Sequence, residues 1–344
     1  MAVNDRVAKA IAEHLGKAPA KVIVADTTHV SVPLTLADDQ KLYSSVFGYV
    51  PATGDFPVTV LPTNSNPEIA RLVPDIDSDY VVQKTEAALL VAGIEDNDKT
   101  LLTGPTGSGK SSLVKYICAK LNRPFLRINM SGDVESASLF GTLVVRGGAT
   151  VWEDGAVTEA AKHGAVCLVD EWELMPAEIA MGMQNLLEEN GYLYLKEMPA
   201  TSAERTITPH KDFRLVFAGN TAGQGDTTGA FSGVGIQNSA TIDRFSNTIA
   251  LNYLSTAHEV AIITSKSNIS PDIAKSMVRM AGLVRNAYDQ GKLGLTMSPR
   301  TLINWARKCT RYNTSYALEM AFLNKLSADD TKSVLEMYNK VFGV

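Results

Sequence analysis

A glycine-rich segment between an apolar run and a helix-forming run constrains this chain more than any other feature. Residues 104–111 read GPTGSGKS and fit the pattern G-x-x-x-x-G-K-[ST]. The apolar run TLLT precedes the segment, and SSLVKYICAKL follows it. A glycine turn without a ligand is the simpler alternative, but the strand and helix on either side favour a phosphate-binding loop. Glycines let backbone N–H groups surround phosphate oxygens, and the helix N-terminus adds partial positive charge.

This loop predicts the nucleotide contacts and part of a metal site. Lys110 is expected to meet the β- and γ-phosphates of ATP, and Ser111 is expected to ligate Mg²⁺. The predicted nucleotide-binding residues are Gly104, Pro105, Thr106, Gly107, Ser108, Gly109, Lys110, Ser111 and Ser112. Magnesium carried by the nucleotide is the only metal that the sequence predicts, because the histidines form no H-x-x-x-H pair and no C-x-x-C occurs.

Polar residues follow two later apolar runs. AVCLVDE, residues 165–171, ends in Asp170 and Glu171, which are expected to hold the Mg²⁺ water shell and to orient the attacking water, respectively. FRLVFAGN, residues 213–220, ends in Asn220, which we expect to lie between the other two strand ends and to contact the water or γ-phosphate. Taken alone, Asn220 is more typical of a turn or helix cap.

The chain divides into three predicted regions. Residues 1–80 contain a helix near 6–16, strand-like pieces from Lys21 and a proline-rich stretch of edge strands and turns, which together predict a small α+β region. Residues 81–254 alternate helices with buried strands, which predicts an α/β core with a mostly parallel sheet. Residues 255–344 lose the strand pattern, and Ser-Pro pairs at 270–271 and 298–299 predict helix starts in an all-helical domain.

Composition excludes several classes of protein. A chain of 344 residues with 45% hydrophobic and 20% charged residues is typical of folded proteins with more than one packed unit. A net charge of −5 argues weakly against a protein that coats DNA. The three cysteines are scattered and do not form the pattern of a disulfide framework. The sequence contains no run of 18 apolar residues that could span a membrane. We therefore expect a cytoplasmic protein.

Two arginines and several apolar side chains allow alternative interpretations. Arg244 could reach the γ-phosphate of a neighbouring subunit, although an ion pair with Asp243 is the simpler interpretation. Arg300, near the start of a predicted helix at Pro299, could point at phosphate or lie on the surface. Trp172, Trp305 and the methionines at 175, 181 and 183 are expected to be mostly core residues.

Longer motifs resemble the MoxR branch of the AAA+ ATPases, in particular its CobS-like members, from about Val73 to Arg311. The least generic stretches are DEWELMPAEIAMGMQNLLEENGYLYL, FRLVFAGNTAGQGDTTGAFSGVGIQNSATIDRFSNTIALNYL and MSPRTLINWAR. VRGGATVWEDGAVTEAAKHGAVCLVDE is also similar to the NorQ and CbbQ activases, and VFGY at 46–49 is similar to the CobS N-terminal region. The resemblance implies Walker A at Gly104–Ser111, Walker B at Asp170 and Glu171, sensor 1 at Asn220, an arginine finger at Arg244 and sensor 2 at Arg300.

The resemblance also implies an architecture and a use for ATP. It implies an AAA+ P-loop core with a helical lid, a hexameric ring completed by Arg244 in trans, and hairpin insertions at LVVRGGATVWEDG and YLYLKEMPATSAERTITPHKDF that face a central pore. Trp172 departs from the small or acidic residue common after Walker B, which leaves the substrate class open.

Three functions follow as hypotheses. The leading one is an ATP-hydrolysing motor that remodels or activates a partner protein, with a von Willebrand factor A (VWA) domain protein as the partner class that the resemblance implies. The second is the ATPase subunit of a cobaltochelatase. The third, a motor stimulated by nucleic acid, depends only on Arg146, Lys196 and Arg205 in the predicted hairpins.

Overall fold

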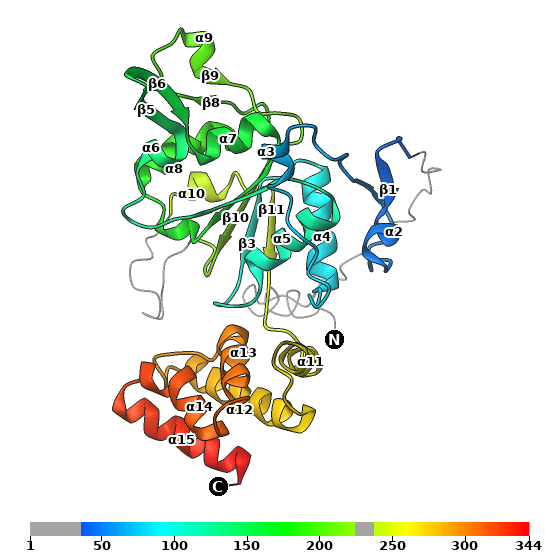
Figure 1. Cartoon of the computed structure of the whole chain (residues 1–344), viewed down its shortest axis with the longest axis vertical. Coiled ribbons are helices and arrows are strands. Elements are labelled where there is room, and N and C mark those ends of the chain that lie inside the picture. The colour runs from blue at the N-terminus through cyan, green and yellow to red at the C-terminus, as the bar shows by residue number, and fades with distance from the viewer. Residues whose placement is uncertain (1–35, 224–236, 344) are drawn as a thin grey trace, which may run out of the picture. The chain divides into compact units, whose positions relative to one another are not determined.

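The computed structural model describes residues 36–223 and 237–343. The helix predicted near 6–16 and the strands predicted from Lys21 lie outside these residues. Residues 38–344 form one compact unit, separate from residues 1–37. Figure 1 shows the order of its elements along the chain.

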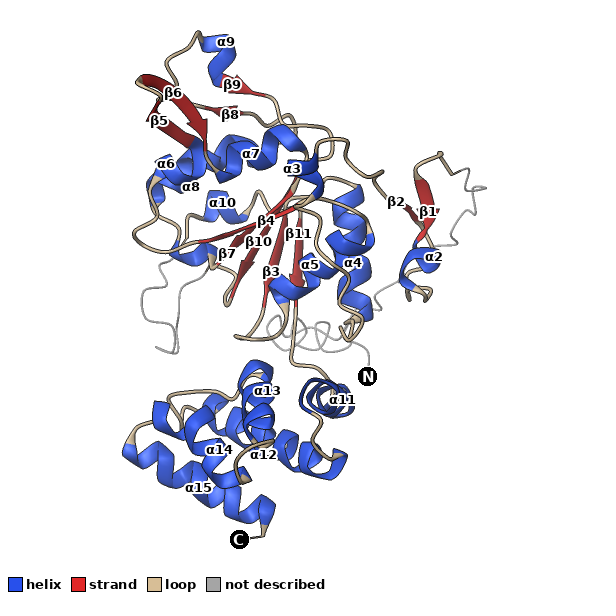
Figure 2. Ribbon diagram, in the orientation of Figure 1, coloured by secondary structure: helices blue, strands red, loops and turns tan. Residues whose placement is uncertain are grey.

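A five-stranded parallel sheet forms the centre of the α/β part (Figure 2). Its strand order is β11-β3-β10-β7-β4. The strands are β3 (Thr100–Thr103), β4 (Phe125–Asn129), β7 (Val166–Asp170), β10 (Arg214–Gly219) and β11 (Asn247–Ala250). Because β10 pairs with β3 on one side and β7 on the other, the prediction that Asn220 lies between the other two strand ends is confirmed.

Alternating side chains on these strands supply two hydrophobic cores, one on each face of the sheet. Leu101 and Cys167 pack into one core with α7 (Ala156–His163), whereas Leu102 and Leu168 pack into the other. The second core includes apolar side chains of α4 (Lys84–Glu95) and α5 (Lys110–Lys120). The strands are apolar on both faces because both faces are covered, as expected for a parallel sheet.

Two antiparallel strand pairs extend from the α/β part in the predicted hairpin segments. β5 (Gly141–Arg146) pairs with β6 (Ala149–Asp154), and β8 (Leu193–Tyr194) pairs with β9 (Thr206–Ile207). The short elements around them are α6 (Ser136–Phe140), η1 (Trp172–Leu174), α8 (Ala177–Met183), η2 (Gln184–Leu187), α9 (Ser202–Arg205) and α10 (Ser239–Ile242). Val145 on β5 is 75% exposed, so this hairpin presents apolar surface to solvent.

Between residues 255 and 343 the structure contains helices joined by loops and turns, and no strand, as predicted for an all-helical region. Its elements are α11 (Thr256–Ser267), α12 (Pro271–Asp289), α13 (Pro299–Lys308), α14 (Thr314–Ala321), η3 (Leu323–Lys325) and α15 (Ala328–Phe342). Ser270 and Ser298 cap α12 and α13 by accepting hydrogen bonds from backbone N–H groups, and proline occupies the first turn of each helix. These helices bury a separate hydrophobic core around Trp305 and Met277.

Residues 38–80 pack against the α/β part. β1 (Gln40–Leu42) pairs with β2 (Pro57–Thr59), and the short helices α2 (Tyr43–Phe47) and α3 (Pro67–Ala70) complete this segment. Tyr43, Phe47 and Val58 join the same buried cluster as α4 and α5. A domain boundary at residue 80 stays a prediction.

Candidate functional site

The phosphate-binding loop lies between β3 and α5, where the sequence predicts it. Gly104 has a φ of +143°, and a Cβ added there would lie 2.1 Å from the carbonyl oxygen of Leu251. Gly107 has a φ of +79°, and a Cβ there would lie 2.7 Å from Cβ of Ser298. Larger residues would therefore strain the backbone and collide with neighbouring segments. The loop precedes the first turn of α5, whose backbone N–H groups are available for an anion.

Lys110, which follows this loop, contacts Asn220 at the end of β10. Nζ of Lys110 donates to the carbonyl oxygen of Gly104 at 2.7 Å and to Oδ1 of Asn220 at 3.2 Å. Burial lowers the pKa of the Lys110 ammonium, and the nearby acids Asp170, Glu173 and Glu171 oppose this effect. Loop carbonyls thus hold the lysine in place, and no carboxylate among the described residues pairs with it directly, which leaves its charge available for phosphate.

Ser111 and Asp170 form a set of hard oxygen donors. Oγ of Ser111 donates to Oδ2 of Asp170 at 2.5 Å, so the hydroxyl on α5 and the carboxylate at the end of β7 converge. Hydroxyl and carboxylate oxygens are the ligands that Mg²⁺ prefers, with the remaining positions supplied by water and phosphate. The residues present therefore fit a magnesium ion that is held jointly with a nucleotide.

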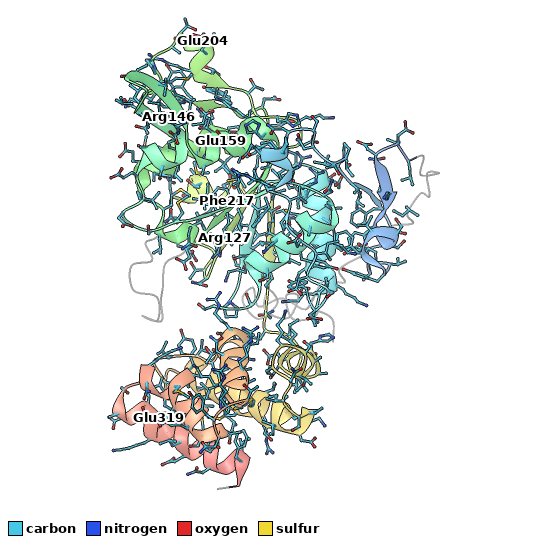
Figure 3. The ribbon with its side chains drawn as sticks, in the orientation of Figure 1. Arg127, Arg146, Glu159, Glu204, Phe217 and Glu319 are labelled. Carbon is cyan, nitrogen blue, oxygen red and sulfur yellow. The ribbon has the colours of Figure 1, made fainter. Side chains whose placement is uncertain are left out.

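Arg127 on β4, which was not among the predicted site residues, contacts the same carboxylate. Its Nε and Nη2 lie 2.8 and 2.7 Å from Oδ2 of Asp170 (Arg127 is labelled in Figure 3). About half of the Arg127 side chain is exposed, and it lines the cleft beside the phosphate-binding loop. The available signal was a charged residue between the apolar Leu126 and Ile128 in the strand FLRIN.

Glu171 follows Asp170 in a left-handed backbone conformation, with φ 55° and ψ 38°. Such a conformation is uncommon for a residue other than glycine and is often found at functional sites. It turns the chain out of the sheet, so that Asp170 is buried whereas Glu171 is exposed and lines the cleft. An exposed carboxylate next to the phosphate-binding loop can accept a proton from water.

Glu173 is a second buried acid at the site and was not among the predicted site residues. It is 3% exposed, and its Oε1 accepts a hydrogen bond from the backbone N–H of Thr221 at 2.7 Å. A Cβ added to Gly219 would lie only 2.4 Å from Oε1 of Glu173. Glu173 therefore joins the turn after β7 to the end of β10 on both sides of Asn220.

The structure places the two predicted arginines differently. Arg300, in the first turn of α13, is exposed and lines the same cleft of about 590 Å³ as the phosphate-binding loop. Arg244 is not among the residues that line this cleft. Its Nε lies 2.7 Å from Oε1 of Glu188, so the alternative of an ion pair with Asp243 was wrong about the partner.

The expected core residues are mostly buried. Trp172 and Trp305 are 1% and 0% exposed, and Met175 and Met183 are buried as well. Met181 is the exception, with 74% of its surface exposed on α8. Among the described residues, Cys118, Cys167 and Cys309 are free thiols. No helix among the described residues is both long enough and apolar enough to span a membrane.

Comparisons with known proteins agree with this geometry. Residues 99–245 match the family described as AAA domain (dynein-related subfamily), and residues 259–340 match the family described as CbbQ/NirQ/NorQ C-terminal. The chain is 34% identical over 282 residues to the aerobic cobaltochelatase subunit CobS of a Sinorhizobium species, covering 79% of this chain and 83% of that protein.

Two further relatives extend the comparison. Protein NorQ of Paracoccus denitrificans is 29% identical over 73% of this chain and 88% of its own length. The mouse von Willebrand factor A domain-containing protein 8 is 26% identical over 62% of this chain and 11% of its own length. Two family matches that follow each other along the chain, together with a relative that aligns over most of both lengths, establish the family. The chain belongs to the MoxR-like CobS/NorQ family of AAA+ ATPases.

Proposed function

We propose that this chain hydrolyses ATP in a magnesium-dependent reaction and uses the energy to remodel or activate a partner protein. The observation that carries the proposal is the convergence of Lys110, Ser111, Asp170, Glu171 and Asn220 from three strand ends on one cleft. This set supplies a cation for phosphate, oxygen ligands for a metal, and a carboxylate and an amide for water.

Each residue has a distinct task in phosphoryl transfer. Lys110 exchanges its contacts with loop carbonyls for the β- and γ-phosphates, where its charge offsets the charge of the transition state. Ser111 and Asp170 hold Mg²⁺, which neutralises phosphate charge when bound. Glu171 orients the attacking water and accepts its proton, and Asn220 holds the water or γ-phosphate in line for attack.

The position of Arg244 outside the cleft supports completion of the site by a neighbouring subunit. We propose that Arg244 and Arg300 stabilise the γ-phosphate, Arg244 from the next subunit of a hexameric ring and Arg300 from the same chain. A trans-acting arginine requires a closed assembly, which couples hydrolysis to subunit movement.

Mixing two inactive variants tests this arrangement. Arg244→Ala subunits keep an intact nucleotide cleft, whereas Lys110→Ala subunits keep the arginine. Neither variant alone should hydrolyse ATP well, but mixed rings should regain part of the activity because some interfaces combine both intact groups. Absence of recovery at every mixing ratio, with assembly confirmed by light scattering, would contradict action in trans.

The partner protein is the least specified part of the proposal. Similarity to a protein named for its von Willebrand factor A domain supports a VWA-domain protein as partner, and exposed apolar side chains on β5, including Val145, suit contact with a protein. Arg146 pairs with Glu153 at 2.6 Å, which reduces the case for nucleic acid at this hairpin. We propose that the protein acts in the cytoplasm.

A trapped complex can identify the partner. Glu171→Gln should bind ATP but hydrolyse it slowly, which holds the assembly on its partner. Proteins that copurify with Glu171→Gln and ATP, but not with Lys110→Ala, are candidates. Similarity to CobS supports cobaltochelatase as the second function, and recovery of a large chelatase subunit in this experiment would favour it.

A further inference from the structure

Tyr253 connects the phosphate-binding loop to the segment that leads into the helical part. It follows β11 and precedes α11, and its hydroxyl donates to the carbonyl oxygen of Thr106 at 3.1 Å. Thr106 lies 147 residues earlier in the chain, inside the phosphate-binding loop. Burial raises the pKa of the Tyr253 phenol, so the hydroxyl stays protonated and able to donate at neutral pH.

Arg285 on α12 lies against the face of the Tyr253 ring. Its Cζ is 4.0 Å from the ring centroid. Nη1 and Nη2 of Arg285 each lie 2.9 Å from a carboxylate oxygen of Glu259, which is 2% exposed on α11. Such a bidentate pair fixes the plane of the guanidinium group. Because Glu259 neutralises this arginine and occupies both terminal nitrogens, Arg285 is not placed to bind phosphate itself.

The third nitrogen of Arg285 holds the start of α13. Nε donates to the carbonyl oxygen of Met297 at 2.8 Å, and Ser298, the next residue, is the N-cap of this helix. Arg300 lies in the first turn of α13 and lines the nucleotide cleft. The Ser298 side chain also packs closely against Gly107, so the start of α13 adjoins the phosphate-binding loop directly.

We infer that Tyr253, Arg285 and Glu259 are positioning residues that fix the start of α13, and therefore Arg300, relative to the phosphate-binding loop. The path runs from the Thr106 carbonyl through Tyr253 and Arg285 to the Met297 carbonyl. Its consequence for ATP rests on the proposed function: a loop ordered by phosphate also orders Arg300. If the three residues only stabilised the helical part, changes to Tyr253 would alter overall stability without a selective effect at α13.

Hydrogen exchange in the nucleotide-free chain separates these roles. Tyr253→Phe removes only the hydroxyl, and the matched control Tyr312→Phe removes a hydroxyl from a 45% exposed ring on the helical part. We expect the amides of Thr301 and Leu302 to exchange about 2- to 10-fold faster in Tyr253→Phe, the range for loss of one hydrogen bond. Tyr312→Phe should leave them unchanged, and the midpoint of thermal unfolding should stay close to the wild-type value in both variants.

Arg285→Lys completes a double-mutant cycle. Lysine keeps the charge but cannot bind Glu259 and Met297 together, so exchange at α13 should accelerate. Adding Tyr253→Phe should then have a smaller further effect than in the wild-type chain, because the Arg285 part of the path is already broken and only the interaction of the hydroxyl with Thr296 remains on this side. Unchanged exchange in Tyr253→Phe, or effects of the two changes that multiply independently, would overturn the inference. Titration of the wild-type chain with ATP is a separate test, and failure to bind ATP would contradict the proposed function. The exchange comparison uses the nucleotide-free chain, so it would still decide the positioning role.

Discussion

Arg244 is held by Glu188 within the same chain. Nε of Arg244 lies 2.7 Å from Oε1 of Glu188, and Nη1 donates to the carbonyl oxygen of Ala240 at 2.6 Å. The guanidinium is therefore occupied on two sides, away from the nucleotide cleft of its own chain. If Arg244 acts on a neighbouring subunit, at least part of its guanidinium must leave these partners, so Glu188 opposes that movement.

Glu188→Gln should raise ATP turnover by about 2- to 5-fold, because a half-exposed ion pair contributes at most about 1 kcal/mol. The measurement is steady-state ATP hydrolysis at saturating ATP. Glu189→Gln is the matched control, since it removes the same charge from the adjacent exposed residue. Equal effects of the two variants would show that net charge, and not the Arg244 contact, is responsible.

Arg127 and Ser111 both contact the same carboxylate oxygen of Asp170. A magnesium ion at this site, or a water molecule bound to it, would compete with Arg127 for that oxygen. Arg127→Gln should therefore lower the Mg²⁺ concentration for half-maximal hydrolysis, by about 2- to 5-fold because the arginine is half exposed and its attraction is screened. Arg127→Lys retains a competing cation and should lie closer to the wild type. A higher Mg²⁺ requirement in Arg127→Gln would show instead that Arg127 supports the metal site.

The sequence predicted the elements of the site better than their mutual contacts. The alternation of helices and strands in residues 81–254, the Ser-Pro helix starts and the central place of Asn220 follow from local patterns, since apolar runs, caps and the geometry of parallel strands leave few alternatives. The contact of Arg127 with Asp170 joins residues 43 positions apart, and the contact of Tyr253 with Thr106 joins residues 147 positions apart. Such contacts depend on how strands and helices pack, which no local pattern encodes. The partner of Arg244 was missed for the same reason, because Glu188 is 56 positions away.

Gly219→Ala should impair hydrolysis more than nucleotide binding. A Cβ there would meet the Glu173 carboxylate at 2.4 Å, so Gly219→Ala must displace either that buried acid or the end of β10. Because Asn220 is the next residue, its amide should move, and turnover should fall by about tenfold, equivalent to about 1.4 kcal/mol. Overpacking should also cost about 1–3 kcal/mol of stability.

The test of Gly219→Ala compares turnover, ATP affinity and the free energy of unfolding. Gly132→Ala serves as control, since a Cβ at Gly132 meets nothing within 4 Å. Loss of ATP affinity equal to the loss of turnover would argue that the phosphate-binding loop, and not Asn220, had been disturbed.

Lys110 should make ATP binding depend on pH in the alkaline range. Burial lowers the pKa of its ammonium in the free chain, whereas bound phosphate adds negative charge and raises it. A pKa raised by binding means that the contribution of Lys110 to affinity is complete below the free-chain pKa. It is lost progressively as the pH rises from that value to the pKa of the complex, by at most about tenfold per pH unit.

Calorimetry from about pH 8 to about pH 10, in buffers that differ in ionisation enthalpy, measures both this affinity loss and the accompanying proton uptake. Lys110→Arg is the matched control, because a guanidinium stays charged throughout this range. The variant should bind ATP more weakly, since its planar group fits the lysine position poorly, but its affinity should be independent of pH. The same alkaline loss in Lys110→Arg as in the wild type would assign the titration to another group.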